Sequence, residues 1–294
     1  MYNEKTWIDK LKVFMTFGFI PLFAFATVIL VPFCMGIFTT LTDWNGTSDT
    51  FHFLGLSNYQ AALTDSTFWA SMGTTLKYVV VTLVLTNVVA FGLALLVTGG
   101  FKGQNFFRAG YFTPNLIGGI ILGFVWQFIF ARVFTYAGRE LDWGFLSSSW
   151  LGDPDKALWA LIIVSIWQNA GYMMLIYVAG LNGISASLTE AASLDGASYI
   201  RQLFNVKIPL MVPAFTISLF LTLQRSFMVY DTNLSLTKGD PFRSTELIAM
   251  HVYNEAFVYQ RFGPGQAKAF ILFAVVAIIA IVQVSVMKKV EVEA

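Results

Sequence analysis

Long runs without charged residues constrain this chain more than any other feature of its sequence. Five runs contain no Asp, Glu, Lys or Arg, and a sixth is interrupted only by Arg225. Each run is long enough to cross a membrane, because the hydrocarbon core of a bilayer needs roughly 20 consecutive apolar residues per helix. The six predicted spans are residues 13–38, 78–101, 109–131, 157–189, 208–230 and 269–287. We therefore predict an all-α polytopic membrane protein with six transmembrane helices.

Composition supports this prediction and excludes several classes of function. Of the 294 residues, 56% are hydrophobic and 12% are charged, far from the balance of an ordinary soluble domain. The formal net charge of +1 provides no basic surface for nucleic acid. The single cysteine, Cys34, excludes a disulfide framework or a cysteine-rich metal site within one chain. The apolar stretches are continuous instead of alternating, which disfavours a membrane β-barrel.

The distribution of charge predicts the orientation of the spans. Residues 39–74, the first predicted outer loop, contain no Lys or Arg. Cytoplasmic loops of membrane proteins carry an excess of Lys and Arg, and the first helix usually sets the topology. We therefore expect both termini to lie in the cytoplasm.

The inner loop between the fourth and fifth spans, at about residues 182–210, carries the most specific pattern. Ser187 and Glu190 have the spacing of a capping box, which predicts a helix that begins there. Gly196 then permits a sharp change of direction, and Pro209 marks the return to the membrane. The pattern predicts two helices separated by a break beneath the bilayer, a shape suited to docking in a partner's groove. The plainer alternative is an ordinary pair of surface helices.

This loop resembles the signature of the permease subunits of ATP-binding-cassette (ABC) importers. That signature is Glu-Ala-Ala, three residues, Gly, nine residues and Ile-x-Leu-Pro. Residues 190–192, Gly196 and Pro209 match it, while Val206 and Ile208 keep the apolar character of the Ile and Leu positions. The resemblance implies that the loop is a coupling helix pressed against an ATPase subunit. The coupling residues it implies are Glu190, Ala191, Ala192, Leu194, Asp195 and Gly196.

Further stretches are similar to the sugar-transporting branch of that family, and the resemblance covers nearly the whole chain. These stretches are residues 53–59, 106–108, 194–197 and 237–245. The first of them favours the maltose-type first permease, or F-like subunit. The resemblance implies a type I ABC importer permease fold, with residues 1–294 as one transmembrane domain in a bacterial inner membrane. The implied function is import of a carbohydrate, with an oligosaccharide favoured.

The resemblance also implies partners and a source of energy. An extracytoplasmic sugar-binding protein would deliver the solute, and a second permease subunit would complete the pathway as a heterodimer. Two ATPase subunits would bind ATP and Mg²⁺. This chain lacks the Gly-x4-Gly-Lys-Ser/Thr phosphate loop, so we expect it to bind no cofactor of its own.

Polar residues inside the spans are the candidates for the solute path, because unpaired polar groups are costly in hydrocarbon and tend to face a cavity. Neutral amides and aromatic rings suit a sugar, whose hydroxyls donate and accept hydrogen bonds. The cluster that we predict to line the path is Gln168, Asn169, Tyr172, Gln224, Arg225 and Tyr230. For each residue, hydrogen bonding between helices is an equally good interpretation. We interpret Asn87 and Gln283 as such helix contacts, and Lys77 and Lys268 as side chains that extend to the interface.

Two other classes of membrane protein remain as alternatives, an intramembrane enzyme and an ATP-independent transporter or channel. The histidines, His52 and His251, fall in predicted outer loops without metal-ligand spacing, and no Gly-x-Ser-x-Gly motif occurs. We therefore predict no catalytic residues and no metal site. An ion-coupled transporter would need carboxylates within its spans, and the six spans contain none. These observations favour a transporter subunit whose ATP is hydrolysed by other chains.

Overall fold

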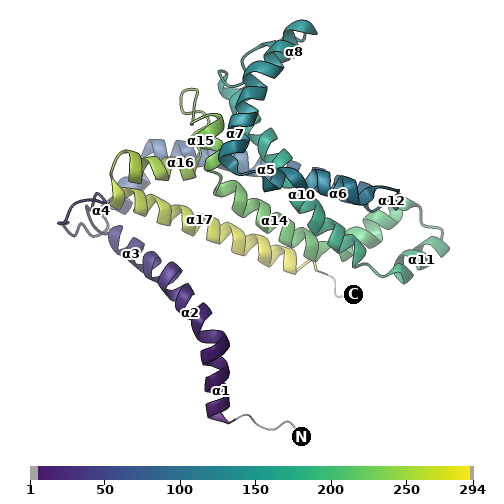
Figure 1. Cartoon of the computed structure of the whole chain (residues 1–294), viewed down its shortest axis with the longest axis horizontal. Coiled ribbons are helices and arrows are strands. Elements are labelled where there is room, and N and C mark those ends of the chain that lie inside the picture. Colours follow the sequence, from purple (N-terminus) through teal and green to yellow (C-terminus); the bar gives the residue numbers. More distant parts are fainter. Residues whose placement is uncertain (1–5, 292–294) are drawn as a thin grey trace. The chain divides into compact units, whose positions relative to one another are not determined.

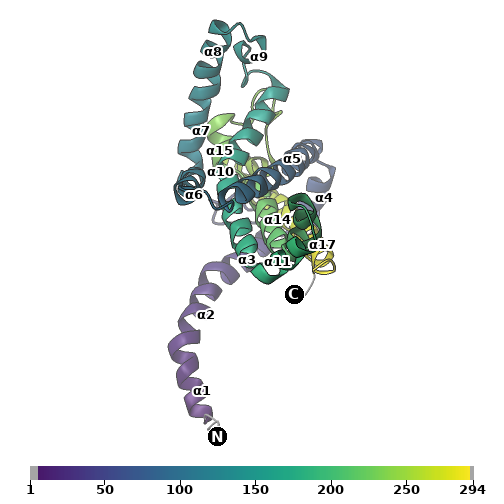
Figure 2. The ribbon, with the colours of Figure 1, turned by 90° about the vertical axis from the view of Figure 1, so that its right-hand side faces the viewer.

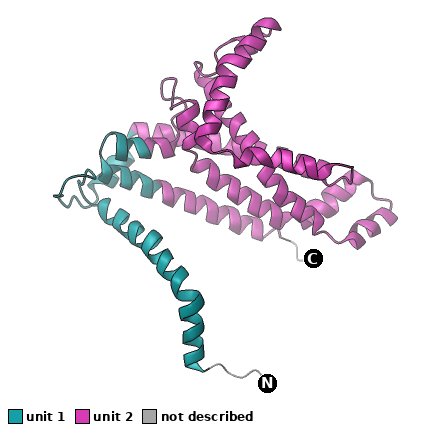
Figure 3. Ribbon diagram, in the orientation of Figure 1, with its two compact units in different colours: residues 1–65, 252–271 teal, residues 66–251, 272–294 magenta. Residues whose placement is uncertain are grey.

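Apolar stretches fold into helices throughout the chain, because a backbone in hydrocarbon must pair its N–H and C=O groups within its own segment. The computed structural model describes residues 6–291 (Figure 1). Among these residues, the β structure is limited to one isolated bridge between Thr42 and Phe53. Tertiary contacts divide the chain into two compact units, residues 1–65 with 252–271 and residues 66–251 with 272–294 (Figure 3).

Six candidate spans are present, which confirms the predicted helical membrane fold. Five are long apolar helices, at Trp7–Thr39, Ser66–Val97, Gly119–Glu140, Pro154–Asn182 and Phe262–Lys288. The sixth is a broken pair, Tyr199–Leu210 and Val212–Phe227, bent by 69°. The first five and last three residues lie outside the described residues, so the cytoplasmic placement of both termini stays a prediction.

Unit 1 holds the N-terminal span and part of the C-terminal one. Its helical segments are α1 (Trp7–Val13), η1 (Phe14–Gly18), α2 (Phe19–Phe25), η2 (Ala26–Leu30), α3 (Val31–Thr39), α4 (Ser57–Thr64), η6 (Asn254–Val258) and the beginning of α17 (Phe262–Lys288). None of the described residues from α1 through α3 is buried. Asn58 fixes the loop that follows, since its Nδ2 donates to the carbonyl oxygens of Thr40 and Thr42 at 2.8 and 2.7 Å.

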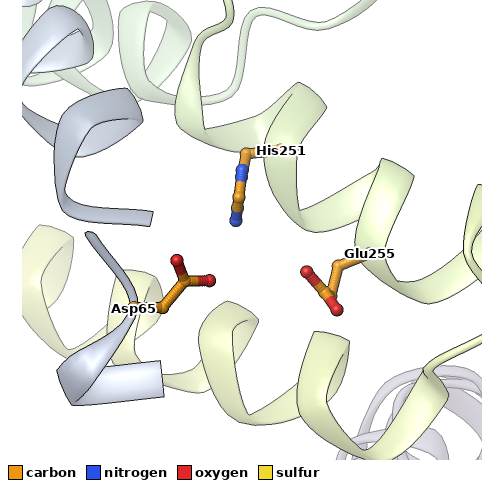
Figure 4. A group of neighbouring side chains, drawn as sticks. All are labelled: Asp65, His251 and Glu255. Atoms are coloured by element: carbon orange, nitrogen blue, oxygen red, sulfur yellow. The ribbon is translucent and has the colours of Figure 1, made fainter. Parts of the chain in front are cut away.

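Lys268 corrects one sequence-based interpretation. We expected it to extend to the membrane interface, but its residue is only 4% exposed. Its Nζ lies 2.6 Å from Asp65 Oδ2 and 2.6 Å from Glu255 Oε2, both within unit 1. The two carboxylates are labelled in Figure 4. The Lys268 ammonium group can be buried because the two carboxylates replace its hydration. The bond to Asp65 joins segments about two hundred residues apart in sequence.

Unit 2 contains the remaining helices. They are α5 (Ser66–Val97), α6 (Gln104–Phe112), η3 (Thr113–Leu116), α7 (Gly119–Phe128), η4 (Ile129–Phe134), α8 (Thr135–Glu140), α9 (Gly144–Ser147), α10 (Pro154–Asn182), α11 (Ala186–Leu194), α12 (Tyr199–Gln202), η5 (Leu203–Lys207), α13 (Ile208–Leu210), α14 (Val212–Phe227), α15 (Asp231–Leu236), α16 (Ile248–Tyr253) and the rest of α17. Helix α5 packs along α10 and α14, and α10 also packs on α14 (Figures 1 and 2).

Several predicted boundaries were wrong, and two of these errors lie near prolines. The third span begins at Gly119 instead of residue 109, because α6 ends at Phe112 and Pro114 lies in a 3₁₀ turn before extended backbone at Gly118. The fifth span, predicted from residue 208, is bent at Met211. Pro213 cannot donate a backbone hydrogen bond and its ring crowds the carbonyl four residues earlier, which breaks the helix there.

A buried group of polar side chains joins the three central helices of unit 2, and we call it the Asn87 hub. Asn87 Oδ1 accepts hydrogen bonds from Tyr177 Oη and Ser218 Oγ, each at 2.6 Å. Its Nδ2 donates to Thr222 Oγ1 at 3.3 Å. Asn87 belongs to α5, Tyr177 to α10, and Ser218 and Thr222 to α14. The interpretation of Asn87 as a helix contact is therefore confirmed.

Helices α7 and α15 approach closely through glycine. A Cβ atom at Gly123 of α7 would overlap Ser235 of α15, and one at Gly119 would lie 2.8 Å from Asp231 Cβ. Larger residues at these two positions would push the helices apart. This close contact holds α15, the helix that follows α14, against α7.

Candidate functional site: an exposed loop and a polar cavity

The loop after α10 forms the predicted arrangement of helix, break and helix. Helix α11 ends at Leu194, and Gly196 follows with a φ of +77°, a conformation that side chains disfavour. The Ala197 amide donates to the Ala192 carbonyl at 2.9 Å, and the Gly196 amide to the Ser193 carbonyl at 3.1 Å. This pair of bonds is a Schellman motif, which ends a helix and turns the chain. The predicted role of Gly196 in the break is therefore confirmed.

The predicted capping box is wrong. Helix α11 begins at Ala186, one residue before the expected start, and its N-cap residue Ser185 makes no capping hydrogen bond. The hydroxyls of Ser185 and Ser187 lie 2.7 Å apart instead. Because Ser187 already lies in the first helical turn, its hydroxyl does not occupy the N-cap position from which a side chain reaches the free amides.

A side chain that the sequence analysis did not single out holds the two halves of the loop together. Gln202 Nε2 donates to Ser193 Oγ at 3.0 Å and to the Ala197 carbonyl at 2.9 Å. These bonds connect α12 to α11 across the break. The angle between the two short helices is thus fixed by side-chain contacts as well as by Gly196.

Most of the predicted coupling residues are accessible on the surface of unit 2. Glu190, Ala191, Leu194, Asp195 and Gly196 are exposed, and Ala192 is half-buried. Leu194 is 89% exposed. The exposed apolar side chains of this region are Leu188, Leu194, Tyr199, Ile200 and Phe204. An apolar patch on a rigid turn is a typical protein contact surface.

A polar cavity of about 330 Å³ lies between α10 and α14. Its lining residues are Tyr78, Asn115, Ser165, Gln168, Asn169, Gln224, Arg225, Ser226, Met228 and Val229. Four of the six residues predicted for the solute path, Gln168, Asn169, Gln224 and Arg225, are among them. Tyr230 lines an adjoining cavity of about 280 Å³ that also includes Gln168. The structure therefore brings together residues from two spans that are separated by the loop.

Arg225 connects the sixth predicted residue, Tyr172, to this cavity. Its Cζ atom lies 4.4 Å from the centroid of the Tyr172 ring. Its Nη1 donates to Asn169 Oδ1 at 2.9 Å. A guanidinium stacked on an aromatic ring and bonded to an amide has a fixed plane. These contacts hold the Arg225 side chain against α10 within unit 2.

Among the lining residues that the sequence analysis missed are three polar ones outside α14, namely Tyr78, Ser165 and Asn115. Tyr78 and Ser165 form a buried hydrogen bond between α5 and α10. Asn115 Nδ2 donates to the Gln168 carbonyl at 3.3 Å, and Gln168 Nε2 donates to the Ile117 carbonyl at 3.1 Å. A signal for Asn115 was present, because it follows Pro114, where freed backbone groups favour polar neighbours. Tyr78 and Ser165 gave no comparable signal.

Outside the spans, His251 lies between the fifth and sixth spans, where the sequence analysis placed it. It is part of helix α16 and is buried, and its side of the membrane stays a prediction. His251 Nδ1 lies 3.2 Å from Glu246 Oε1, and Arg243 also binds Glu246. Burial favours the neutral carboxyl, but the hydrogen bonds from His251 and Arg243 outweigh burial and lower the pKa of Glu246 to about 2.

Comparison with known proteins decides the family. The model of the family described as "Binding-protein-dependent transport system inner membrane component" matches residues 4–292. The chain belongs to this family. It is accordingly a transporter permease subunit and not an enzyme, as the sequence analysis predicted.

Two relatives of this permease cover almost its whole length. The probable starch degradation products transport system permease protein AmyD of Thermoanaerobacterium thermosulfurigenes is 44% identical over 266 residues, 90% of each chain. The multiple sugar-binding transport system permease protein MsmF of Streptococcus mutans is 30% identical over 277 residues, 94% of this chain and 96% of that one. Both matches cover nine-tenths or more of the permease described here.

A solved structure confirms the fold of the permease. The crystal structure of a bacterial ABC transporter involved in the import of the acidic polysaccharide alginate contains a chain that superposes with a TM-score of 0.82. The match covers 96% of this chain and 97% of that chain at 17% identity. This likeness shows that the ABC importer permease fold predicted from the sequence is correct.

Proposed function

We propose that this chain is the first of two permease subunits of an ATP-driven importer that moves a carbohydrate, with an oligosaccharide favoured, through the polar cavity. One observation carries the proposal. The cavity is built from α10 and α14, the two helices that enter and leave the exposed loop with Glu190 and Gly196. A push on that loop would therefore act directly on both walls of the cavity.

The chemistry of the cavity supports a sugar as the solute. Gln168, Asn115 and Gln224 supply amides that both donate and accept hydrogen bonds, as sugar hydroxyls do. Tyr230 in the adjoining cavity adds an aromatic ring on which the CH face of a sugar can pack. The relatives named for starch degradation products and for multiple sugars agree with this substrate class.

The loop supports coupling to separate ATPase subunits. Glu190 is exposed and ionisable, and Leu194 is almost fully exposed, so both are available to a partner. A charge-assisted hydrogen bond from Glu190 would anchor the loop, and Leu194 would fill an apolar pocket of the ATPase. Closure of the ATPase subunits on ATP and Mg²⁺ would then move α10 and α14 as rigid bodies.

The Asn87 hub supports transmission between the loop and the cavity. On α10, Tyr177 lies between Gln168 and the loop, and on α14, Ser218 lies between the loop and Arg225. Because Asn87 bonds both side chains, α10 and α14 are held to α5 at that level. Movement at the loop would therefore tilt the two helices about this contact.

The proposal includes the other parts of the importer. A second permease would complete the cavity as a heterodimer, and an extracytoplasmic sugar-binding protein would deliver the solute. We expect this chain to bind no cofactor or metal, since ATP and Mg²⁺ belong to the ATPase subunits. With the loop in the cytoplasm, both termini would face the cytoplasm of a bacterial inner membrane.

Charge reversal in the loop tests the coupling. We expect Glu190→Lys to reduce uptake of a labelled maltooligosaccharide to the level of cells without this chain. The same variant should lose the ATPase subunits during purification from native membranes, because a lysine replaces the anchoring carboxylate. Glu140→Lys is the matched control, since Glu140 is an exposed carboxylate of α8 outside the loop. Normal uptake and normal ATPase recovery with Glu190→Lys would refute coupling through this loop.

A further inference from the structure

We propose that Arg225 makes the cavity selective for charge. The cavity prefers a sugar that carries a carboxylate, accepts a neutral sugar less well, and rejects a sugar that carries a protonated amine. This inference rests on the proposed passage of carbohydrate through the cavity. It adds a rule for which carbohydrates pass.

The first step is that the Arg225 guanidinium is held in place. It lies in the last turn of α14, where Asn169 and Tyr172 of α10 hold it by the hydrogen bond and the ring contact described above. Both partners come from the facing helix, so the side chain bridges the two walls of the cavity. Arg suits this position better than Lys would, because a planar guanidinium stacks on a ring while it donates in its own plane.

The second step is that the charge of Arg225 is not balanced by its own surroundings. The residues that line this cavity include no Asp or Glu, and Asp231 lines only the adjoining cavity. In the described part of unit 2, the ion pairs are those of Arg243 and His251 with Glu246, and none involves Arg225. A guanidinium has five N–H groups, and the structure commits one of them to Asn169. A charge inside a membrane domain is costly, and such residues mark the paths of solutes.

The third step is the chemistry of the solute. The carboxylate of a uronic acid can accept two parallel hydrogen bonds from a guanidinium and also neutralises its charge. The hydroxyl oxygens of a neutral sugar can accept single hydrogen bonds from it. A protonated amine offers only donors and is repelled by a positive charge in a medium of low dielectric constant.

The other polar side chains of the cavity do not distinguish charge. Asn115, Gln168, Asn169 and Gln224 are neutral amides, Ser226 has a neutral hydroxyl, and Tyr78 and Ser165 are bound to each other. Amides bind donors and acceptors equally. Discrimination between solutes of different charge in this chain's part of the cavity is therefore assigned to Arg225.

Uptake of three matched disaccharides tests the proposal in the complete importer, reconstituted in proteoliposomes with its binding protein. The probes differ only in the terminal residue, which is glucosyl, glucuronyl or glucosaminyl, in a mildly acidic buffer that protonates the amine. Initial rates are expressed as ratios to the glucosyl probe. Each ratio for a variant is divided by the wild-type ratio, which removes the contribution of the unchanged binding protein.

We expect Arg225→Gln to raise the relative uptake of the glucosaminyl probe and to lower that of the glucuronyl probe, each by about tenfold or more. Arg225→Lys should still reject the glucosaminyl probe, because the charge remains, but should lose part of the preference for the glucuronyl probe, because the planar fork is gone. Lys77→Gln is the matched control. It removes one positive charge from an exposed position of α5 and should leave both ratios unchanged.

Two results would overturn the inference in different ways. If Arg225→Gln slows all three probes equally, or leaves both ratios unchanged, Arg225 braces α14 against α10 without selecting charge, and the proposed sugar path stands. If the wild-type importer takes up none of the probes, the proposed carbohydrate function fails and the charge rule fails with it.

Discussion

The loop between α10 and α14 and the Asn87 hub, which joins those two helices to α5, are built in opposite ways. In the loop, Leu194 and Glu190 are exposed, and backbone hydrogen bonds around Gly196 set the shape. In the hub, Asn87 and Ser218 are buried, and side-chain hydrogen bonds between three helices set the geometry. The loop is arranged for contact with another protein, whereas the hub is arranged for contact within the chain. Substitutions should therefore separate partner binding from stability.

Replacement of Asn87 should give the largest change in stability. Asn87→Leu keeps the volume of the side chain but leaves the hydroxyls of Tyr177 and Ser218 without their shared acceptor. We expect a loss of about 2 kcal/mol in the free energy of unfolding, since each buried polar group left unpaired costs about 1–3 kcal/mol and less where membrane neighbours re-pair it. Thermal unfolding of the purified importer in nanodiscs measures this loss.

The same variant sharpens the contrast with the loop. Asn87→Leu should retain the ATPase subunits on purification at a temperature below its lowered melting point, because it leaves the loop surface unchanged. Asn105→Leu, a change at an exposed amide of α6, is the control for the loss of an amide. An unchanged melting temperature for Asn87→Leu would show that the hub does not hold the helices together.

Replacement of Gly196 should act on coupling, with a smaller effect on free energy. No atom lies within 4 Å of a Cβ placed at Gly196, so Gly196→Ala is opposed only by the backbone, whose φ is +77°. That conformation costs an L-residue about 1–2 kcal/mol, which predicts uptake lower by about tenfold. Uptake of labelled maltooligosaccharide and ATPase recovery measure the effect.

A second glycine provides the matched control for this prediction. Gly144→Ala adds the same methyl group where there is also open space, but without a positive φ. It should leave uptake unchanged. If Gly196→Ala lowers the melting temperature as much as Asn87→Leu but leaves uptake normal, the proposed division between loop and hub is wrong.

The smallest expected effect concerns pH and the segment between α14 and α17, which belongs to neither the loop nor the hub. The pKa of Glu246 is lowered to about 2 by His251 and Arg243, which outweigh burial. A lowered pKa stabilises the folded state above the carboxyl's ordinary pKa, and this stabilisation is lost as the pH falls toward about 2. Wild-type protein should therefore lose more thermal stability on acidification than Glu246→Gln.

Glu140→Gln serves as the control for this pH dependence, because Glu140 is an exposed carboxylate of α8. It should keep the wild-type dependence of melting temperature on pH. Identical acid dependence in Glu246→Gln and wild-type protein would contradict the stabilising role of the ionised Glu246.

Much of the fold could be predicted from local rules. The six spans followed from runs of apolar residues, because the thickness of a bilayer sets the length of each helix. The break at Gly196 followed from the freedom of glycine to adopt a positive φ. The errors arose where local signals compete, as at Pro114 and Pro213, and at Ser187, where the helix begins one residue earlier than the capping pattern indicated.

The candidate site could be predicted in part. Gln168 and Arg225 were selected because polar side chains in hydrocarbon are costly and tend to face a cavity. Both line the cavity in the structure. Tyr78 was missed because a tyrosine at the beginning of a span gives no sign of the direction it faces. Lys268 was misinterpreted because one of its two carboxylates, Asp65, is about two hundred residues away in sequence and the other lies beyond the start of α17.

The sequence by itself determined that the chain crosses a membrane several times, that its fourth and fifth spans flank a structured loop, and which polar residues are candidates for the path. These properties depend on the length of apolar runs and on the conformational limits of glycine and proline. Only the tertiary structure decided that Arg225 stacks on Tyr172, that Asn87 joins three helices and that Lys268 is buried. Which groups meet depends on the faces that helices turn toward one another, and that is set by packing across the whole unit.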